Sequence, residues 1–562
     1  LERAPDADPD ALVHHFQGAG EHQTAAKYAV VAGDRAADAL AFARASKLYR
    51  FALDLGEFED EGRSVRVKLA DALAASGHGY EAAHAYLEAA GRADHADVFE
   101  LKRRASEQLL QGGHLDEGLS VVGDVLNHAG LRLAKTPTRA LLSLLALRAR
   151  LSLRGLGFTE RDEKALAPEA LLPVDASWSV TTGLAIVDHI RSAEFGARNL
   201  LLALDAGEPL RIVRALAMEL AYTSISGAKS RPYNEKLIAI AEPLAARIPN
   251  AEARGLLTLA KGSAAYMQGQ WPVARELCEQ ARQTLREQCT RVAWQIDTAE
   301  FYTLLSSFYL GDMRDIARRL PALLKEARER DALYAETILR TRIGFLACLT
   351  ADDVAGAETA VRQGMQRWSH KGFHNQHYYE MVASAETQLY AGHGADAWSG
   401  MERKWRDLRR TLLLRVQPVQ IESVHLRART AIAAACASAP GKRAALVAQA
   451  ERGAGEIRKT RAPWATGLAE LTSSGTASLR GSAPEAIAHL EAAERIFDRE
   501  RMGLFGAVAR RRRGELLGAA DGDALVQSAN AWMREQSIAN PARFADMLAP
   551  GEFADCVRLS NR

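Results

Sequence analysis

A turn residue recurs four times between residues 254 and 405, followed five and twelve positions later by residues that are small or apolar, except for Lys404 in the last copy. The marks begin at Gly269, Gly311, Asp352 and Gly392, so they lie 42, 41 and 40 residues apart. A fixed period of this length is typical of stacked helical hairpins. In each copy one helix ends at the turn residue and a second helix begins at once. The repeat therefore predicts an all-α fold.

The first copy of the repeat is the most complete. Gly262 precedes Gly269 by seven residues and Trp271 follows it by two, while Ala274 and Ala281 supply the small residues. Small side chains at these steps allow neighbouring helices to approach closely. This arrangement resembles the tetratricopeptide repeat (TPR) pattern, slightly stretched. We predict a TPR-like α-solenoid, a superhelix of stacked antiparallel helical hairpins.

The same punctuation predicts further repeats on both sides of the regular core. With 562 residues, the chain is too long for one hydrophobic core, which favours a solenoid. A C-terminal copy begins at Gly481, and Asn540 followed by Pro541 predicts a helix start within a terminal cap. The N-terminal marks are Gly20, Leu40, Gly77 and Gly113.

These marks divide the chain into five predicted segments. Between residues 131 and 250 the repeat pattern is no longer recognisable. This segment is therefore either an irregular helical connection or a boundary between two arrays. The predicted segments are a linker over 1–10, helical hairpins over 11–130, an irregular helical connection over 131–250, regular repeats over 251–405, and helical repeats with a cap over 406–562.

Composition excludes several classes of function. The chain carries 72 basic and 70 acidic residues, a net charge of +2, so no global field favours nucleic acid or an anionic membrane. Five scattered cysteines without a CxxC pair favour a reducing cytoplasm. The apolar stretch 140–147 ends at Arg148, and no segment reaches the roughly 18 uninterrupted apolar residues that crossing a bilayer requires. We expect a cytoplasmic protein.

Motifs for catalysis are missing from the sequence. The segment Gly227-Ala228-Lys229-Ser230 has the wrong order for a phosphate-binding GxxxxGK[ST] loop, and no HRD, DFG, GxSxG or HExxH motif occurs. We therefore predict a protein without catalytic residues or cofactor, and not an enzyme.

One group of residues has the spacing of a metal site. His374, His377 and Glu380 lie at steps of three and would share part of one helical face. The two histidines, however, stand among aromatic residues at a predicted helix start, where they can cap or stack. No second compact ligand group lies nearby, so we predict no metal.

Groove-facing positions of the repeats carry aromatic and charged residues. Aromatic anchors among a few charges suit a recognition surface for a protein, a peptide or a small ligand. The alternative is that these rings pack between repeats. The predicted groove residues are Tyr266, Phe301, Arg342, Tyr379, Glu386 and Tyr390.

Several segments resemble those of one family of bacterial signalling proteins. The segments are His14-His15-Phe16 to Tyr49-Arg50-Phe51, Cys289 to Trp294, Gly372 to Tyr379, Trp532-Met533 to Asn540-Pro541-Ala542-Arg543, and Met547 to Pro550. Together they resemble the C-terminal TPR-like region of serine/threonine protein kinases that carry an AAA/STAND-type ATPase module. The likeness spans nearly the whole chain.

The resemblance implies a regulatory role. In such proteins the tail acts as a sensor or autoinhibitory scaffold for the upstream ATPase and kinase. The chain begins at Leu1, and we expect it to be a piece of a longer protein whose upstream modules are its partners. The expected function is thus a non-enzymatic sensor or protein-interaction solenoid. The alternative is a stand-alone receptor for a small molecule or peptide.

Overall fold

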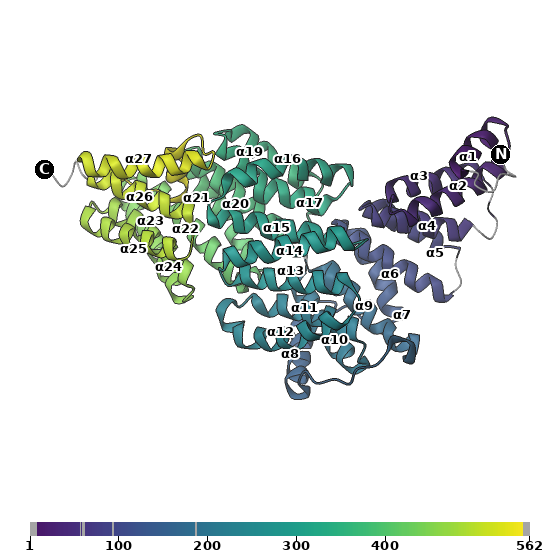
Figure 1. Cartoon of the computed structure of the whole chain (residues 1–562). Coiled ribbons are helices and arrows are strands. Elements are labelled where there is room, and N and C mark those ends of the chain that lie inside the picture. Colours follow the sequence, from purple (N-terminus) through teal and green to yellow (C-terminus); the bar gives the residue numbers. More distant parts are fainter. Residues whose placement is uncertain (1–7, 57, 59–61, 93–94, 186–187, 555–562) are drawn as a thin grey trace. The chain divides into compact units, whose positions relative to one another are not determined.

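The computed structural model of the chain describes residues 8–56, 58, 62–92, 95–185 and 188–554. Throughout these residues the regular elements are helices, and none of them is a strand. Consecutive helices pack on one another along the chain, as Figure 1 shows. The predicted all-α class and the α-solenoid are therefore confirmed. Most of the predicted linker over 1–10 lies outside the described residues.

Two compact units make up the chain. The smaller unit contains residues 1–215, 284–296 and 326–334, and the larger unit contains residues 216–283, 297–325 and 335–562. The helices from the N-terminus to residue 224 are α1 (Pro9–Gly18), α2 (His22–Asp38), α3 (Phe42–Leu55), α4 (Gly62–Ala75), α5 (Gly79–Ala90), α6 (His95–Gly112), α7 (Leu115–His128), α8 (Pro137–Arg154), η1 (Glu163–Ala165), α9 (Pro168–Leu184), α10 (His189–Ala206) and α11 (Pro209–Ser224).

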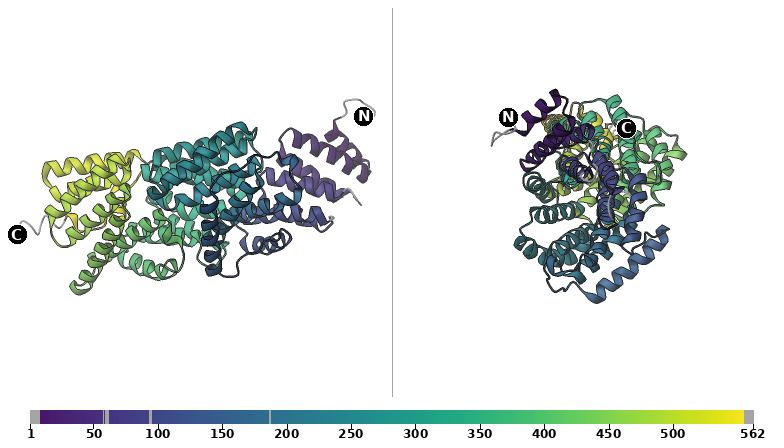
Figure 2. Two further views of the ribbon diagram at one scale, coloured as in Figure 1. Left: turned by 90° about the horizontal axis from the view of Figure 1, so that it is seen from below. Right: turned by 90° about the vertical axis from the view of Figure 1, so that its right-hand side faces the viewer.

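The remaining helices continue to the C-terminus, and the consecutive helices α25, α26 and α27 pack on one another, as the left view of Figure 2 shows in yellow. They are η2 (Gly227–Ser230), α12 (Arg231–Arg247), α13 (Ala251–Met267), α14 (Trp271–Gln288), α15 (Ala293–Leu310), α16 (Met313–Glu329), α17 (Leu333–Ile338), η3 (Leu339–Gly344), α18 (Phe345–Thr350), α19 (Val354–Gln366), α20 (Asn375–Tyr390), α21 (Gly394–Leu408), η4 (Leu413–Arg415), α22 (Gln417–Cys436), α23 (Pro440–Lys459), α24 (Pro463–Leu479), α25 (Ala483–Arg499), α26 (Gly503–Leu517), α27 (Ala519–Glu535) and α28 (Pro541–Leu548).

The punctuation marks of the sequence are the turns between paired helices. Gly269, Gly311, Asp352 and Gly392 have φ angles of +77°, +87°, +61° and +81°, and each separates two helices. This left-handed backbone favours glycine, and aspartate tolerates it better than most residues. These two preferences explain why the turns between paired helices can be recognised in the sequence.

Paired helices of the larger unit differ in how deeply they are buried. Thirteen of the 17 residues of α24 are buried, against six of the 17 residues of α25. We call the first helix of each pair an A helix (α13, α15, α17–α18, α20, α22, α24 and α26) and the second a B helix. A helices that are buried on most sides position the interior side chains, while B helices present one apolar face and one solvated face.

One A helix contains an irregular turn. Between α17 and α18 the backbone adopts π-helical geometry over Leu339–Gly344 (η3), with right-handed helical angles at both joints. A single π-helical turn inside an α-helix is rare and frequently marks a functional site. This turn carries Arg342, which is 2% exposed.

An aromatic contact joins early and late hairpins of the larger unit. The ring of Trp271 stacks on Tyr309 at 4.0 Å, and both rings meet Trp464 of α24 edge-on at 5.3 and 5.7 Å. Trp464 also lies directly against Gly269, where a Cβ atom would approach it to 2.3 Å. These rings therefore bring α14 and α15 into contact with α24, although the helices are far apart in the sequence.

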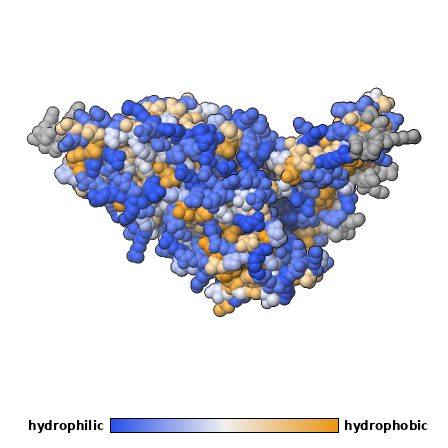
Figure 3. Space-filling view, viewed as in Figure 1, coloured by the Kyte–Doolittle hydropathy of each residue, from blue (hydrophilic) through white to orange (hydrophobic). Residues whose placement is uncertain are grey.

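The surface differs from this interior in composition. Figure 3 shows a face that is largely hydrophilic, with separated hydrophobic patches. Within the described part of the chain, none of the helices combines the length and hydrophobicity that crossing a bilayer requires.

Candidate functional site: the polar interior and the C-terminal segment

A buried ion pair lies inside the larger unit. The Nη2 group of Arg342 donates to Oε1 of Glu422 at 2.5 Å, and the two side chains are 3% and 14% exposed. The hydroxyl of Tyr378 donates to the other carboxylate oxygen of Glu422. The guanidinium also lies over the ring of Tyr379, 5.8 Å from its centroid. The π-helical turn therefore delivers a fully desolvated cation to α20 and α22.

The tyrosines around this pair stay protonated. Burial is the largest cause that raises the pKa of Tyr266, Tyr302, Tyr309, Tyr378 and Tyr379 above the usual tyrosine value. Burial alone would lower the pKa of the guanidinium, but the facing carboxylate outweighs it and holds this pKa well above the ordinary value. The ion pair and the tyrosines around it thus comprise one cation, one anion and neutral hydroxyl groups.

The structure brings four of the six predicted groove residues together. Tyr266, Phe301 and Tyr379 are linked through Tyr302, with ring centroids 5.2, 5.9 and 5.7 Å apart along the chain of contacts, and Arg342 lies over the last ring. Tyr266, Phe301 and Arg342 are buried, while Tyr379 and the linking Tyr302 are partly buried. Their role in ligand binding stays a prediction.

The other two predicted residues lie apart from this cluster. Glu386 is 3% exposed and accepts a hydrogen bond from Nη2 of Arg429 at 2.6 Å. Tyr390 is 1% exposed and donates to Asp352 at 2.7 Å. Both residues are on α20, and both belong to the surface that holds the C-terminal residues of the described chain.

Several buried polar groups of the A helices have no hydrogen-bond partner within the described residues. Gln376, which is fully buried, leaves both amide atoms unpaired, and the Nε2 atom of His425 is unpaired as well. An unpaired buried polar group costs about 1–3 kcal/mol. Water or the polar atoms of a ligand would remove that cost. The unpaired hydroxyl groups are those of Ser306, Ser307, Thr387 and Ser423.

Sequence reasoning missed these polar groups because it searched for charged and aromatic residues. The available signal was the Ser306-Ser307 pair inside an otherwise apolar helix and the Ser423 to His425 run in α22. A helix that is apolar on most sides is buried, so its polar side chains are buried as well and require hydrogen-bond partners.

A segment near the C-terminus, residues 538–553, lies across the A helices α20, α22, α24 and α26. We call it the C-terminal segment. Arg429 Nη1 donates to the carbonyl of Met547 at 3.0 Å, and Arg512 Nε donates to the carbonyl of Ala549 at 2.9 Å. The amide of Glu552 donates to Ser478 Oγ at 3.1 Å. The repeats thus hold this segment by its main chain.

Ion pairs fix both ends of the C-terminal segment. Asp352 accepts from Arg543 at 2.9 Å and from the Asn540 amide at 3.2 Å. The Tyr390 hydroxyl makes the largest contribution to lowering the pKa of Asp352 below its usual value. At the other end, Arg443 forms a two-pronged ion pair with Glu552.

The apolar side chains of the C-terminal segment fill the space between these polar contacts. Phe544, Met547 and Leu548 are 0% exposed, and the ring of Phe544 meets Tyr390 edge-on at 5.7 Å. Their steps of three and four residues place them on one face of α28. The helix begins as predicted, with Asn540 as N-cap accepting from the amide of Arg543.

Substitution of Gly475 is expected to loosen the C-terminal segment. A Cβ atom at this position of α24 would lie 2.6 Å from the carbonyl oxygen of Pro550. We expect Gly475→Ala to lower the free energy of unfolding in urea. Gly455→Ala on α23 is the matched control, because its Cβ meets nothing within 4 Å. The control should gain about 0.5–1 kcal/mol from helix propensity. Equal gains in both variants would contradict this packing.

The histidines of the predicted metal-like group act in helix capping. His377 Nδ1 accepts from the main-chain amide of His374 at 3.1 Å, and His374 Nδ1 accepts from the indole of Trp368 at 3.3 Å. The capping role considered from the sequence is therefore present. Within the described residues, no group of three or more His, Cys, Asp or Glu side chains has a metal-binding arrangement.

Two buried histidines are expected to make stability fall in mild acid. Burial, followed by the neighbouring His374, lowers the pKa of His377 to about 4. Burial, followed by Arg429, lowers the pKa of His425 well below its usual value. Both folded-state values lie below the unfolded value of about 6.5, so the unfolded chain binds protons first.

The stability contributed by the two neutral rings is therefore complete above pH 6.5. It is lost as the pH falls toward the folded-state values. Each histidine contributes a slope of at most about 1.4 kcal/mol per pH unit. Urea unfolding at several pH values should give a smaller slope for His425→Leu than for the original chain. An unchanged slope would mean that this ring charges freely in the folded state.

Comparison with known proteins adds no family to this description. No protein-family model matches the sequence, and a search of curated proteins gives no match.

Proposed function

We propose that the chain is a non-enzymatic recognition solenoid that binds a short amphipathic helix on the surface formed by its A helices. The observation that carries this proposal is the C-terminal segment itself, which already lies on that surface. Its apolar anchors are 0% exposed, and two arginines bind its carbonyl groups. A surface that recognises main-chain atoms and an apolar face can accept other sequences of the same pattern.

The regulatory role follows from competition for this surface. A partner helix must displace residues 538–553, which are tethered and therefore present at a high effective concentration. Binding would then release the C-terminal segment and change the equilibrium between two states, because the partner binds only the open state. This behaviour fits the sensor or autoinhibitory scaffold of a STAND-type signalling kinase. We propose that the chain is the regulatory part of such a kinase and that it acts in the cytoplasm.

Peptide selection tests the proposal directly. A library of random helical peptides is displayed on phage and selected on the full chain carrying Phe544→Ala, which weakens the internal competitor. We expect selected peptides to carry apolar residues at positions i, i+3 and i+4, as Phe544, Met547 and Leu548 do. Selection of peptides without this pattern, or of none, would refute the proposed recognition mode.

A second candidate function is a receptor for a small polar ligand. The unpaired groups of Gln376, Ser423 and His425 favour it, because a bound molecule could satisfy them. Under this alternative, native mass spectrometry of the protein purified from cells detects a retained small molecule. Substituting Gln376 by leucine should abolish that retention. If the original protein retains no small molecule, this second function is refuted and only helix recognition remains as a proposal.

A further inference from the structure

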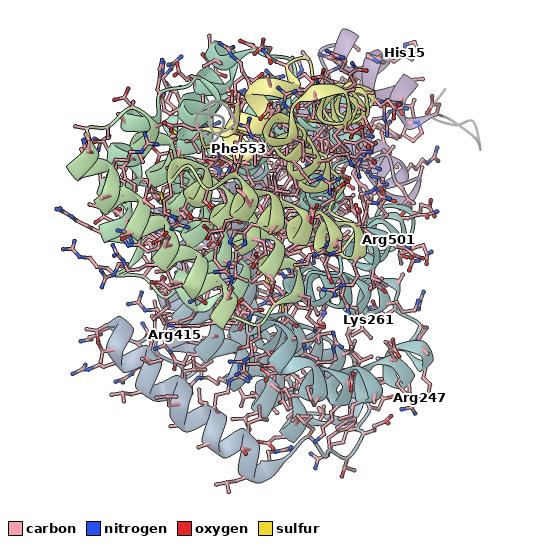
Figure 4. All side chains as sticks on the ribbon, turned by 90° about the vertical axis from the view of Figure 1, so that its left-hand side faces the viewer. His15, Arg247, Lys261, Arg415, Arg501 and Phe553 are labelled. Carbon is pink, nitrogen blue, oxygen red and sulfur yellow. The ribbon has the colours of Figure 1, made fainter. Side chains whose placement is uncertain are left out.

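A basic cavity lies away from the polar interior and the C-terminal segment. It has a volume of about 700 Å³ including open solvent and is formed by three separate stretches of the chain. The stretches are the turn before α12, the η4–α22 junction and the end of α23. Arg415, at the η4–α22 junction, is labelled in Figure 4. The lining residues are Ser226, Lys229, Arg415, Gln417, Gln420, Glu456, Lys459 and Thr460.

One glutamine ties the three stretches together. The main-chain amide of Gln417 donates to the carbonyl of Ile225 at 2.9 Å, and its side-chain amide donates to the carbonyl of Thr460 at 3.4 Å. A Cβ atom on Gly227 would lie 1.8 Å from Oε1 of Gln417, and this glycine has a φ of +66°. The close approach is possible because Gly227 has no side chain, and it lets Gln417 hold the turn before α12 beside the η4–α22 junction.

The three cations of this cavity differ from most of the arginines discussed above, because in the part of the chain that the structure describes their side chains form no ion pair with a carboxylate. Lys229, Arg415 and Lys459 each come from a different stretch, and within the described residues none of them forms an ion pair or hydrogen bond through its side chain. Glu456 is the one carboxylate in the lining. Three positive charges and one negative charge leave an excess of two positive charges at the cavity.

We propose that this cavity binds the phosphate group of a small phosphorylated molecule. An excess of two positive charges matches a phosphate dianion better than a carboxylate, which carries one charge. Arginine fits phosphate oxygens through paired N–H groups, and lysine binds them as a point charge. The hydroxyl group of Ser226 and the side-chain amide of Gln420 can donate to the remaining oxygens.

This site uses part of the Gly227-Ala228-Lys229-Ser230 segment, which the sequence excluded as a nucleotide-binding loop. That exclusion concerned a row of main-chain N–H groups around several phosphates. The cavity instead gathers side-chain cations from positions 229, 415 and 459. Long-range packing supplies the second and third cations, so no local motif could reveal them.

Calorimetric titration of the full chain with inorganic phosphate and with pyrophosphate tests the proposal. We expect saturable binding that weakens as sodium chloride screens the cations. Arg415→Gln and Lys459→Gln should each weaken binding by roughly tenfold, as loss of one charge-assisted contact predicts. Lys442→Gln is the matched control, because Lys442 is an exposed cation on α23 outside the cavity, and it should bind as the original chain does.

Three outcomes would overturn the proposal. The first is an absence of binding at millimolar phosphate and pyrophosphate. The second is an equal loss of affinity in the cavity variants and in Lys442→Gln, which would indicate a diffuse charge effect. The third is cosedimentation with phosphatidylinositol-phosphate vesicles that requires Arg415, without binding of the free anions. That result would assign the same cations to a membrane surface.

Discussion

Replacing Arg342 by methionine is expected to lower the free energy of unfolding by about 3–5 kcal/mol. The substitution leaves Glu422, whose side chain is 14% exposed, with a buried charge and only the Tyr378 hydroxyl as a close partner. A carboxylate in that position must stay uncompensated or take up a proton, and both cost free energy. Chemical unfolding followed by circular dichroism measures the loss.

A double variant and a surface control separate the buried charge from ordinary side-chain loss. Arg342→Met combined with Glu422→Leu removes both charges, and it should recover much of the stability, since apolar residues can replace a buried pair. Arg410→Met breaks an exposed pair with Asp407, in which the arginine is 82% exposed, and it should cost less than about 1 kcal/mol. Equal losses of unfolding free energy for Arg342→Met and Arg410→Met would contradict the burial of the Arg342–Glu422 pair.

Replacing Phe544 by alanine is expected to cost about 3–5 kcal/mol and to release the C-terminal segment. The ring is 0% exposed and contacts Tyr390 of α20. Its loss leaves a cavity between α28 and α20, so the segment should open before the rest of the unit unfolds. Hydrogen exchange followed by mass spectrometry should find faster exchange in residues 538–553 than in the original chain.

The control for this experiment is Leu517→Ala. Leu517 is 45% exposed at the end of α26, so its truncation should change stability by less than about 1 kcal/mol and leave exchange in the C-terminal segment unchanged. If Phe544→Ala also left that exchange unchanged, the segment would be a fixed part of the core and could not act as a displaceable competitor.

Local features of the fold could be predicted from the sequence. Gly269, Gly311, Asp352 and Gly392 punctuate the chain because a left-handed turn restricts the choice of residue. Asn540 marks a helix start for a similar reason, since its side chain caps the first turn. Such signals depend on a few neighbouring residues, so a single sequence contains them.

The contacts that form the candidate site could not be predicted in this way. Arg342 pairs with Glu422, which is 80 residues away, and Arg429 binds the carbonyl of Met547 at a separation of 118 residues. A main-chain carbonyl carries no side-chain signal, and many charged residues could have paired with either arginine. The repeat geometry placed Tyr266 and Tyr379 in the same region, but it did not indicate that residues 538–553 would pack onto neighbouring helices.

Under the proposed function, these contacts make the C-terminal segment an internal competitor for the surface of the A helices. The segment is held by main-chain hydrogen bonds, by ion pairs at both ends and by a single apolar face, so each of the three can be weakened separately. Under this proposal, an external helix with the same apolar spacing would meet the same arginines and the same ring of Tyr390. Weakening the internal copy should therefore strengthen binding of an external one.

The most direct test uses a fluorescently labelled peptide of residues 538–553 added to the full chain. Fluorescence anisotropy compares its binding to the original chain and to the Phe544→Ala chain, with Leu517→Ala as control. The account predicts at least roughly tenfold tighter binding to Phe544→Ala, because the tethered competitor is weakened there. Equal affinity for all three chains, or no binding to a Phe544→Ala chain that keeps its helical content, would contradict it.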